Sequence, residues 1–132
     1  MFRFPIKKFQ ETPTPFYFYD LKLLNKTLDE INRQIKGYPY KVHYAVKANG
    51  NKTILEEIVK KGFGVDLVSG GEIQAALAVG FNPNGMVYSG VGKTDPEIML
   101  GLQHNIFSFN VESVPELEVI NELAGKCGKV AN

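Results

Sequence analysis

Short apolar segments alternate with amphipathic segments along most of this chain, and a polar signal recurs where one gives way to the other. Three boundaries share the spacing of a helix capping box, in which serine or threonine is followed three residues later by glutamate. The pairs are Ser69 and Glu72, Thr94 and Glu97, and Ser113 and Glu116. Because each box follows an apolar run, the pattern predicts repeated strand-to-helix junctions.

The hydrophobic pattern predicts four consecutive strand–helix units preceded by one extra helix. The extra helix is predicted over residues 20–36, where leucine and isoleucine recur at helical spacing. The strands are predicted over residues 41–48, 64–69, 86–89 and 106–111, and their helices over 52–61, 71–79, 96–103 and 114–126. An aromatic run at residues 15–19 also has the composition of a strand.

Strands that alternate with helices indicate an α/β fold with a parallel sheet. A doubly wound sheet and a (β/α)₈ TIM barrel both fit, but the barrel needs about 250 residues. A chain of 132 residues would therefore hold about half of a barrel, and residues 128–132 have the pattern of a fifth strand beginning. The apolar strands predict a core that includes Val42, Tyr44, Val46, Val65, Leu67, Val68, Val87, Ile106 and Phe107.

Charge and cysteine content exclude several classes of function. Fifteen basic and 14 acidic residues give a net charge of +1, whereas nucleic-acid-binding domains usually carry a basic excess. The single cysteine, Cys127, excludes an intramolecular disulfide and a cysteine-rich zinc site. No apolar run approaches the roughly 18 residues of a membrane helix. We therefore expect a cytoplasmic protein with no metal, nucleic-acid or membrane partner.

Lys47 is the first candidate for a functional residue. Strand alternation places His43, Ala45 and Lys47 on one side, which faces the interior if the fold is a barrel. Lys47 would then lie at the C-terminal mouth, where barrel active sites form, and could offer an amine for a Schiff base. The alternative from position alone is a lysine that extends past the strand into water.

Two further residues on the predicted strands have a structural and a functional interpretation. Asp66 interrupts an apolar strand, so its carboxylate must either bond to a neighbour or lie beside a ligand. Ala45 either leaves room for a flat ring or fits a crowded layer of the barrel.

The segment around Lys93 lacks the first glycine of a phosphate-binding loop, because residue 87 is valine. We therefore expect Lys93 to be a surface residue or one lying behind the site at the barrel mouth.

Residues 44–49, YAVKAN, resemble the cofactor-lysine motif of the fold-type III pyridoxal-phosphate enzymes, the barrel decarboxylases related to alanine racemase. Further matches lie at residues 14–20, 64–73, 89–94 and 109–113. Residues 68–72, VSGGE, are similar to the diaminopimelate decarboxylase branch rather than to ornithine or arginine decarboxylases.

The resemblance implies a partial TIM barrel of the alanine-racemase-like type, with about four βα units after an N-terminal strand and helix. Residues 1–20 would form an N-terminal segment that packs against a C-terminal β domain, and residues 21–132 the first half of the pyridoxal-phosphate-binding barrel. It also implies that Lys47 is catalytic and binds pyridoxal 5'-phosphate, with Ala45 and Asp66 beside the cofactor.

The implied reaction is decarboxylation of meso-2,6-diaminopimelate to L-lysine and CO₂, the last step of lysine biosynthesis, by a homodimer. The phosphate site, the substrate contacts and a partner-supplied cysteine lie later in the chain in this family. We therefore expect a truncated N-terminal part that is inactive alone. Two alternatives stay open: a sister decarboxylase acting on carboxynorspermidine or a basic amino acid, and a non-catalytic protein that binds pyridoxal phosphate.

Overall fold

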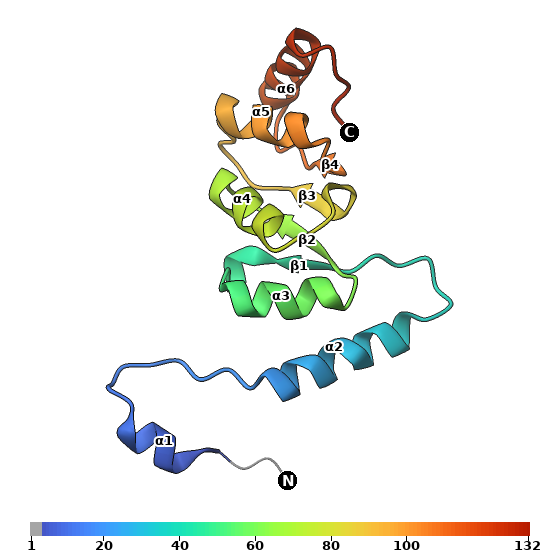
Figure 1. Ribbon diagram of the computed structural model, residues 1–132. Coiled ribbons are helices and arrows are strands. Elements are labelled where there is room, and N and C mark those ends of the chain that lie inside the picture. The colour runs from blue at the N-terminus through green and yellow to red at the C-terminus, as the bar shows by residue number, and fades with distance from the viewer. Residues whose placement is uncertain (1–3) are drawn as a thin grey trace.

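The four strands of the sheet run parallel and pair in chain order, β1-β2-β3-β4. They are β1 (His43–Ala45), β2 (Gly64–Leu67), β3 (Met86–Tyr88) and β4 (Ser108–Phe109). The computed structural model describes residues 4–132. It confirms the predicted parallel α/β arrangement, and Figure 1 shows the chain passing from one unit directly to the next.

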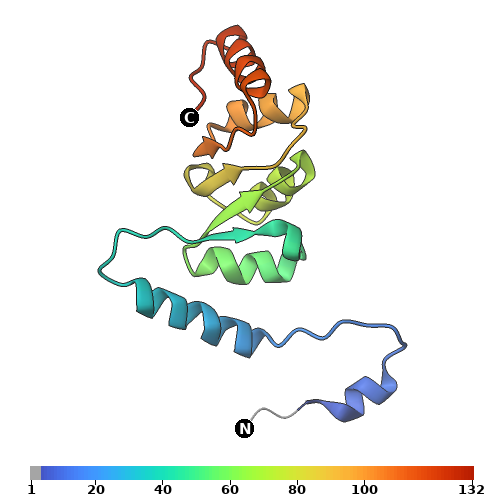
Figure 2. The same cartoon turned by 180° about the vertical axis from the view of Figure 1, so that it is seen from behind.

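Each predicted helix is present, with boundaries shifted by no more than one or two residues. They are α2 (Leu21–Ile35), α3 (Lys52–Lys60), α4 (Gly70–Ala78), α5 (Asp95–His104) and α6 (Val114–Lys126). The connection η2 (Pro83–Gly85) is a short 3₁₀ turn before β3. The views in Figures 1 and 2 show α3 to α6 following the strands while the N-terminal segment leads away from the sheet.

Helices cover one face of the sheet and leave the other face open. The covered face carries the buried side chains Val65, Leu67, Met86, Tyr88 and Phe109, which join the helix side chains in a single core. Alternation along the strands sends the intervening residues to the open face. In a closed barrel this open face is the interior.

The core prediction is correct in part. Val46, Val65, Leu67 and Ile106 are buried, whereas Val42, Tyr44 and Val68 are partly buried. Val87 is only partly buried, because β3 turns Met86 and Tyr88 toward the helices and Val87 toward the open face. Phe107 is 41% exposed, so its assignment to the core is wrong; it precedes the short β4 and its ring packs near His43 at the edge of the sheet.

The first predicted strand is shorter than expected. Residues 43–45 pair with β2, and the chain then forms the 3₁₀ turn η1 (Val46–Ala48). Two asparagines stabilise the backbone that follows this turn. The Asn49 side chain accepts from the Asn51 N–H at 2.9 Å, and the Asn51 side chain caps α3. Lys47 therefore lies on a turn at the end of β1 rather than on the strand itself.

The predicted aromatic strand is not formed. Residues 15–19 are extended but have no ladder partner among residues 4–132, and a strand needs a neighbour to satisfy its backbone. Phe16 and Phe18 instead lie against Phe9 of the short helix α1 (Ile6–Glu11), with ring centroids 5.4 and 5.0 Å apart. Residues 1–3 of the predicted N-terminal segment lie outside the described residues, and the division at residue 20 stays a prediction.

Helix α2 is joined to the first βα unit by polar contacts one helical turn apart. Asn25 donates to Glu57 at 2.6 Å, and Lys61 forms an ion pair with Asp29 at 2.7 Å. Leu28 is buried between these contacts.

Within the part of the chain that the structure describes, no helix combines the length and the apolar character needed to cross a membrane.

All three predicted helix caps are present at the strand-to-helix junctions. The side chains of Ser69 and Ser113 accept from the backbone N–H groups of Glu72 and Glu116, and Thr94 forms a capping box with Glu97. In the first and third junctions the glutamate side chain accepts from the N–H of the residue before the N-cap, whereas a capping box uses the N–H of the N-cap itself. Glu72 accepts from the Val68 N–H, and Glu116 from the Glu112 N–H.

Glu97 links two consecutive units. Its carboxylate accepts hydrogen bonds from the N–H of Gly70 at 2.7 Å, the N–H of Thr94 at 3.0 Å and the Thr94 hydroxyl at 2.7 Å. These donors, the Gly70 N–H foremost, lower the pKa of Glu97 to about 2. One ionised side chain thus holds the first turns of α4 and α5 together.

We predict that Glu97→Gln destabilises the fold by about 2 kcal/mol, because an amide has one acceptor oxygen for several converging donors. The folded pKa of Glu97 is depressed from 4.5 to about 2, so its stabilisation is present above pH 4.5 and is lost as the pH falls between those values. Urea denaturation of both proteins at pH 7 and pH 3 checks this. Glu118→Gln, an exposed change on α6, is the matched control; an equal effect of the two substitutions would contradict the role of Glu97.

Candidate active site

Two of the predicted site residues, Ala45 and Asp66, lie side by side on the open face of the sheet, and Lys47 follows on the turn that ends β1. The strand register pairs Ala45 with Asp66, Asp66 with Val87, and Val87 with Ser108. Ala45 and Asp66 are therefore direct neighbours across β1 and β2, and Lys47 follows Ala45 by two residues. Because the strands are parallel, their C-terminal ends form one edge, and these candidates lie at or near it.

Lys47 is placed by the turn that ends β1. The preceding side chain, Val46, is buried and anchors the turn, while Lys47 itself is exposed. The hydroxyl of Tyr44 donates to the carbonyl of Asn49 at 3.1 Å and closes the turn from the other side. Within residues 4–132 Lys47 forms no hydrogen bond or ion pair. Within these residues its amine is therefore exposed and unpaired at this edge.

Asp66 belongs to a row of polar side chains that crosses three strands. Its Oδ1 accepts from the Ser89 hydroxyl at 2.5 Å, and the Ser89 oxygen accepts from the Asn110 side-chain amide at 3.0 Å. The sequence reasoning missed Ser89 and Asn110. The available signal was that each directly follows the last residue of a strand, Tyr88 of β3 and Phe109 of β4.

Of the two positions expected for Lys93, the one at the surface is wrong, and the lysine lies buried between the loops that follow β3 and β4. Its side chain is 1% exposed, and its amine donates to the carbonyls of Gly90 at 2.7 Å and Asn110 at 2.8 Å and pairs with Glu116. Gly90 and Gly92 both have positive φ, which folds the loop so that the lysine turns inward. Lys93 therefore clamps the loops after β3 and β4 together.

Glu116 completes this clamp at the start of α6. Burial raises the pKa of Glu116, but the hydrogen bonds from Lys93 and from the Glu112 N–H outweigh burial and leave that pKa below its ordinary value. The ion pair is almost fully enclosed, because only 11% of the Glu116 side chain is exposed. The clamp thus fixes the backbone on which Asn110 is carried.

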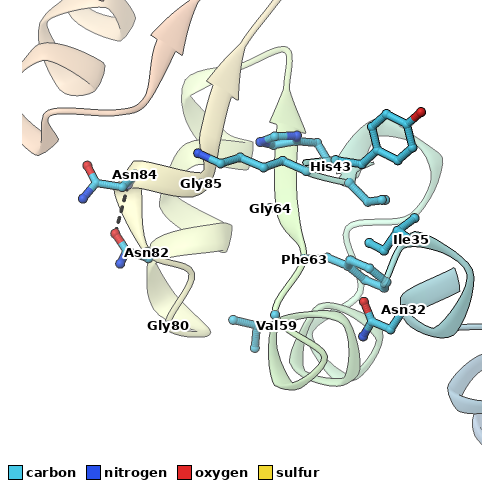
Figure 3. A pocket seen from close by; sticks show the side chains of 14 residues that line it. Asn32, Ile35, His43, Val59, Phe63, Gly64, Gly80, Asn82, Asn84 and Gly85 are labelled. Atoms are coloured by element: carbon cyan, nitrogen blue, oxygen red, sulfur yellow. Dashed lines mark hydrogen bonds between the residues drawn. The ribbon is translucent and has the colours of Figure 1, made fainter. Parts of the chain in front are cut away.

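A cavity of about 510 Å³ lies at the opposite, N-terminal edge of the strands. Figure 3 shows His43 beside Gly64 and Gly85 in its wall. A Cβ on Gly64 would lie 2.4 Å from the Gly85 carbonyl oxygen and 2.5 Å from the His43 ring, so this approach requires glycine. None of Lys47, Ala45 and Asp66 lines this cavity, so the predicted site residues are separate from it.

The side chains at the C-terminal edge fit a planar ligand that carries a carbonyl group. The primary amine of Lys47 can bond to the carbonyl carbon. The carboxylate of Asp66, on the neighbouring strand, can accept a hydrogen bond from an N–H or O–H of the ligand. Ala45 is in register with Asp66, and its small side chain would let a flat ring lie close to the sheet. Lys47, Asp66 and Ala45 are the residues that would hold such a group.

Comparison with known proteins agrees with this geometry. Residues 21–131 match the family described as "Pyridoxal-dependent decarboxylase, pyridoxal binding domain". The chain is 58% identical over 130 residues to diaminopimelate decarboxylase of Bacteroides thetaiotaomicron, covering 98% of this chain and 34% of that protein. The chain thus spans about a third of the length of this relative.

Solved structures show the same architecture. Diaminopimelate decarboxylase from Helicobacter pylori, complexed with L-lysine, superposes with a TM-score of 0.89 at 40% identity, covering 96% of this chain and 32% of that one. The arginine decarboxylase of Paramecium bursaria Chlorella virus has a TM-score of 0.66 at 23% identity, covering 78% of this chain and 28% of that one. At that identity the second likeness shows the fold alone. The sheet and helices described above are the N-terminal part of a TIM-barrel decarboxylase fold.

We predict that Lys93→Met destabilises the protein by about 3–5 kcal/mol, because it leaves the Glu116 carboxylate buried without its partner. Urea denaturation measures the loss, and adding Glu116→Gln should recover part of it. Lys52→Met is the matched control, since the Lys52 side chain is 76% exposed and its pair with Glu56 lies in solvent. Equal midpoints for the two lysine variants would show that the clamp does not stabilise the fold.

Proposed function

Because this chain belongs to the pyridoxal-dependent decarboxylase family and carries its pyridoxal-binding domain, we propose that it is the N-terminal part of a diaminopimelate decarboxylase. The complete enzyme would convert meso-2,6-diaminopimelate to L-lysine and CO₂. The observation that carries this proposal is the 58% identity over almost the whole chain to a diaminopimelate decarboxylase. A decarboxylase for carboxynorspermidine or a basic amino acid is the second candidate, supported here by fold likeness alone.

The rest of the enzyme would complete the barrel over the open face. One backbone contact lies at the outer edge of β4, where the Phe109 N–H donates to the carbonyl of Asn132 at 2.7 Å. This contact supports the predicted fifth strand. We place the complete enzyme in the cytoplasm as a homodimer.

Lys47 would bind the cofactor covalently through its amine. When bound, pyridoxal phosphate supplies the electron sink for the bond that breaks at the substrate Cα. When it is not joined to the cofactor, the amine of Lys47 would serve as the group that delivers a proton to the substrate Cα. Asp66 would attract a cationic nitrogen at the Lys47 end of the site, and Ala45 would let a flat ring lie close to the sheet.

The substrate is tested with the full-length protein. Incubation with meso-diaminopimelate should yield lysine and CO₂, whereas lysine, ornithine, arginine and carboxynorspermidine should react at least 100-fold more slowly, about 3 kcal/mol in the barrier. Product is measured by amino-acid analysis and by trapped CO₂. Faster turnover of carboxynorspermidine or of a basic amino acid would establish the second candidate instead.

For Lys47 we predict that borohydride reduction of the cofactor-loaded protein fixes the cofactor on the peptide that contains this residue. Lys47→Ala should abolish the label and lower kcat by about a thousandfold or more, because the covalent attachment and the proton donor are both removed. Peptide mass spectrometry locates the label. Lys52→Ala, an exposed lysine on the first turn of α3, should leave label and activity intact. Label on any lysine other than Lys47 would overturn the assignment.

The 132-residue chain expressed alone is predicted to have no decarboxylase activity. Its open face leaves half of a barrel interior in water, and its sheet edges lack the neighbours that close a barrel. Such a chain should aggregate or pair with a second copy, as size-exclusion chromatography would show. A soluble monomer with measurable turnover would contradict both the truncation and the predicted need for the missing strands.

A further inference from the structure

We propose that Ser89 and Asn110 are positioning residues that hold the Asp66 carboxylate in one orientation toward Lys47. The proposal rests on the proposed function, because it takes Lys47 as the residue that binds the cofactor. Neither Ser89 nor Asn110 needs to touch the cofactor or the substrate. They would act through Asp66, to which they are joined by two consecutive hydrogen bonds.

The chemistry of the three side chains fixes the direction of both hydrogen bonds. An ionised Asp66 can only accept, so the single hydroxyl proton of Ser89 must point toward it. The Ser89 oxygen is then left to accept, and Asn110 presents its amide N–H group. The Ser89–Asp66 separation of 2.5 Å is that of a charge-assisted O–H···O⁻ bond, which is stronger than a neutral one.

Both positioning side chains are carried on backbone that is fixed on either side. The Ser89 N–H donates to the carbonyl of Leu67 at 2.8 Å, and the Asn110 N–H donates to the carbonyl of Tyr88 at 2.9 Å. The Asn110 carbonyl is also held by the buried amine of Lys93 at 2.8 Å. These bonds hold the backbone of Ser89 and Asn110 in place, so their side chains can keep the Asp66 carboxylate in one orientation.

The row occupies one oxygen of Asp66 and leaves the other available. Oδ1 accepts from Ser89, whereas Oδ2 has no hydrogen-bond partner among residues 4–132. Oδ1 is held by a residue that follows β3, and the other neighbouring strand of Asp66 is β1, with Ala45 in register. Oδ2 is thus placed for a cationic or N–H donor at the end of β1.

The sheet itself does not require this row. The three strands are already joined by backbone ladders, and Asn110 is an exposed residue after the end of β4. Ser108 offers a matched comparison, because it lies on the same face in register with Val87 and its hydroxyl makes no hydrogen bond within the described residues. Removing the Ser108 hydroxyl therefore removes a polar group of this face without touching the row.

The experiment measures the dissociation constant of pyridoxal phosphate from the full-length apoprotein by equilibrium ultrafiltration. Ser89→Ala should raise it about tenfold and Asn110→Ala about threefold, because the carboxylate loses a charge-assisted bond or the support of that bond. Ser89→Thr keeps the hydroxyl and should restore binding, and Ser108→Ala should leave it unchanged. In an Asp66→Asn background, Ser89→Ala should have no further effect.

Each outcome separates the positioning role from a structural one. A tenfold loss that persists in the Asp66→Asn background would overturn the proposal, since the serine would then act by another route. An effect of Ser89→Ala no larger than that of Ser108→Ala would overturn it as well. Should Ser89→Ala fail to fold, Asn110→Ala and Ser89→Thr carry the same test. Full-length wild-type protein that binds no cofactor, or carries no label on Lys47, would instead refute the proposed function.

Discussion

Parallel pairing of the strands determines where chemistry can occur in this protein. Each strand must be followed by a helix that returns the chain to the starting edge, so every strand ends at the same edge and every helix begins there. The unpaired N–H groups of the helix first turns collect at this edge together with the side chains that satisfy them. Lys47 and Asp66 lie at or near this edge, because Lys47 follows the end of β1 and Asp66 is the last residue but one of β2.

Three carboxylates near this edge have different surroundings and therefore different roles. Glu97 accepts from several donors in two helix starts, and its oxygens are fully engaged. Glu116 is paired with Lys93 in an enclosed clamp. Asp66 accepts one hydrogen bond through one oxygen and keeps the other. A carboxylate that retains bonding capacity on an open face is suited to a ligand, whereas the two saturated glutamates stabilise the loops that surround it.

Local patterns were sufficient to predict most of the helices and the first candidate residue. Helical periodicity and the serine or threonine caps depend on neighbours three or four residues away, and the helices after Ser69, Thr94 and Ser113 begin where the caps predict. Lys47 was found because its flanking residues form a motif. Ala45 and Asp66 proved to be neighbours because strand alternation and parallel order together determine their faces.

The features that escaped prediction depend on contacts between distant residues. The row from Asp66 to Asn110 joins positions 44 residues apart, and only the strand register brings them together. Lys93 turns inward because two glycines adopt positive φ, which the sequence permits without requiring. The aromatic residues 15–19 have strand composition, yet composition cannot supply a partner strand.

The pairing of each strand with the next one in the sequence also has a consequence for how the chain is made. Ladder contacts join segments separated by one helix and its loops, so each pairing can form as soon as the next unit has been made. During synthesis on the ribosome, each new βα unit emerges beside the one already folded and can use its edge as a template. The apolar helix-facing core can thus close step by step, while the face that carries Ala45 and Asp66 stays accessible.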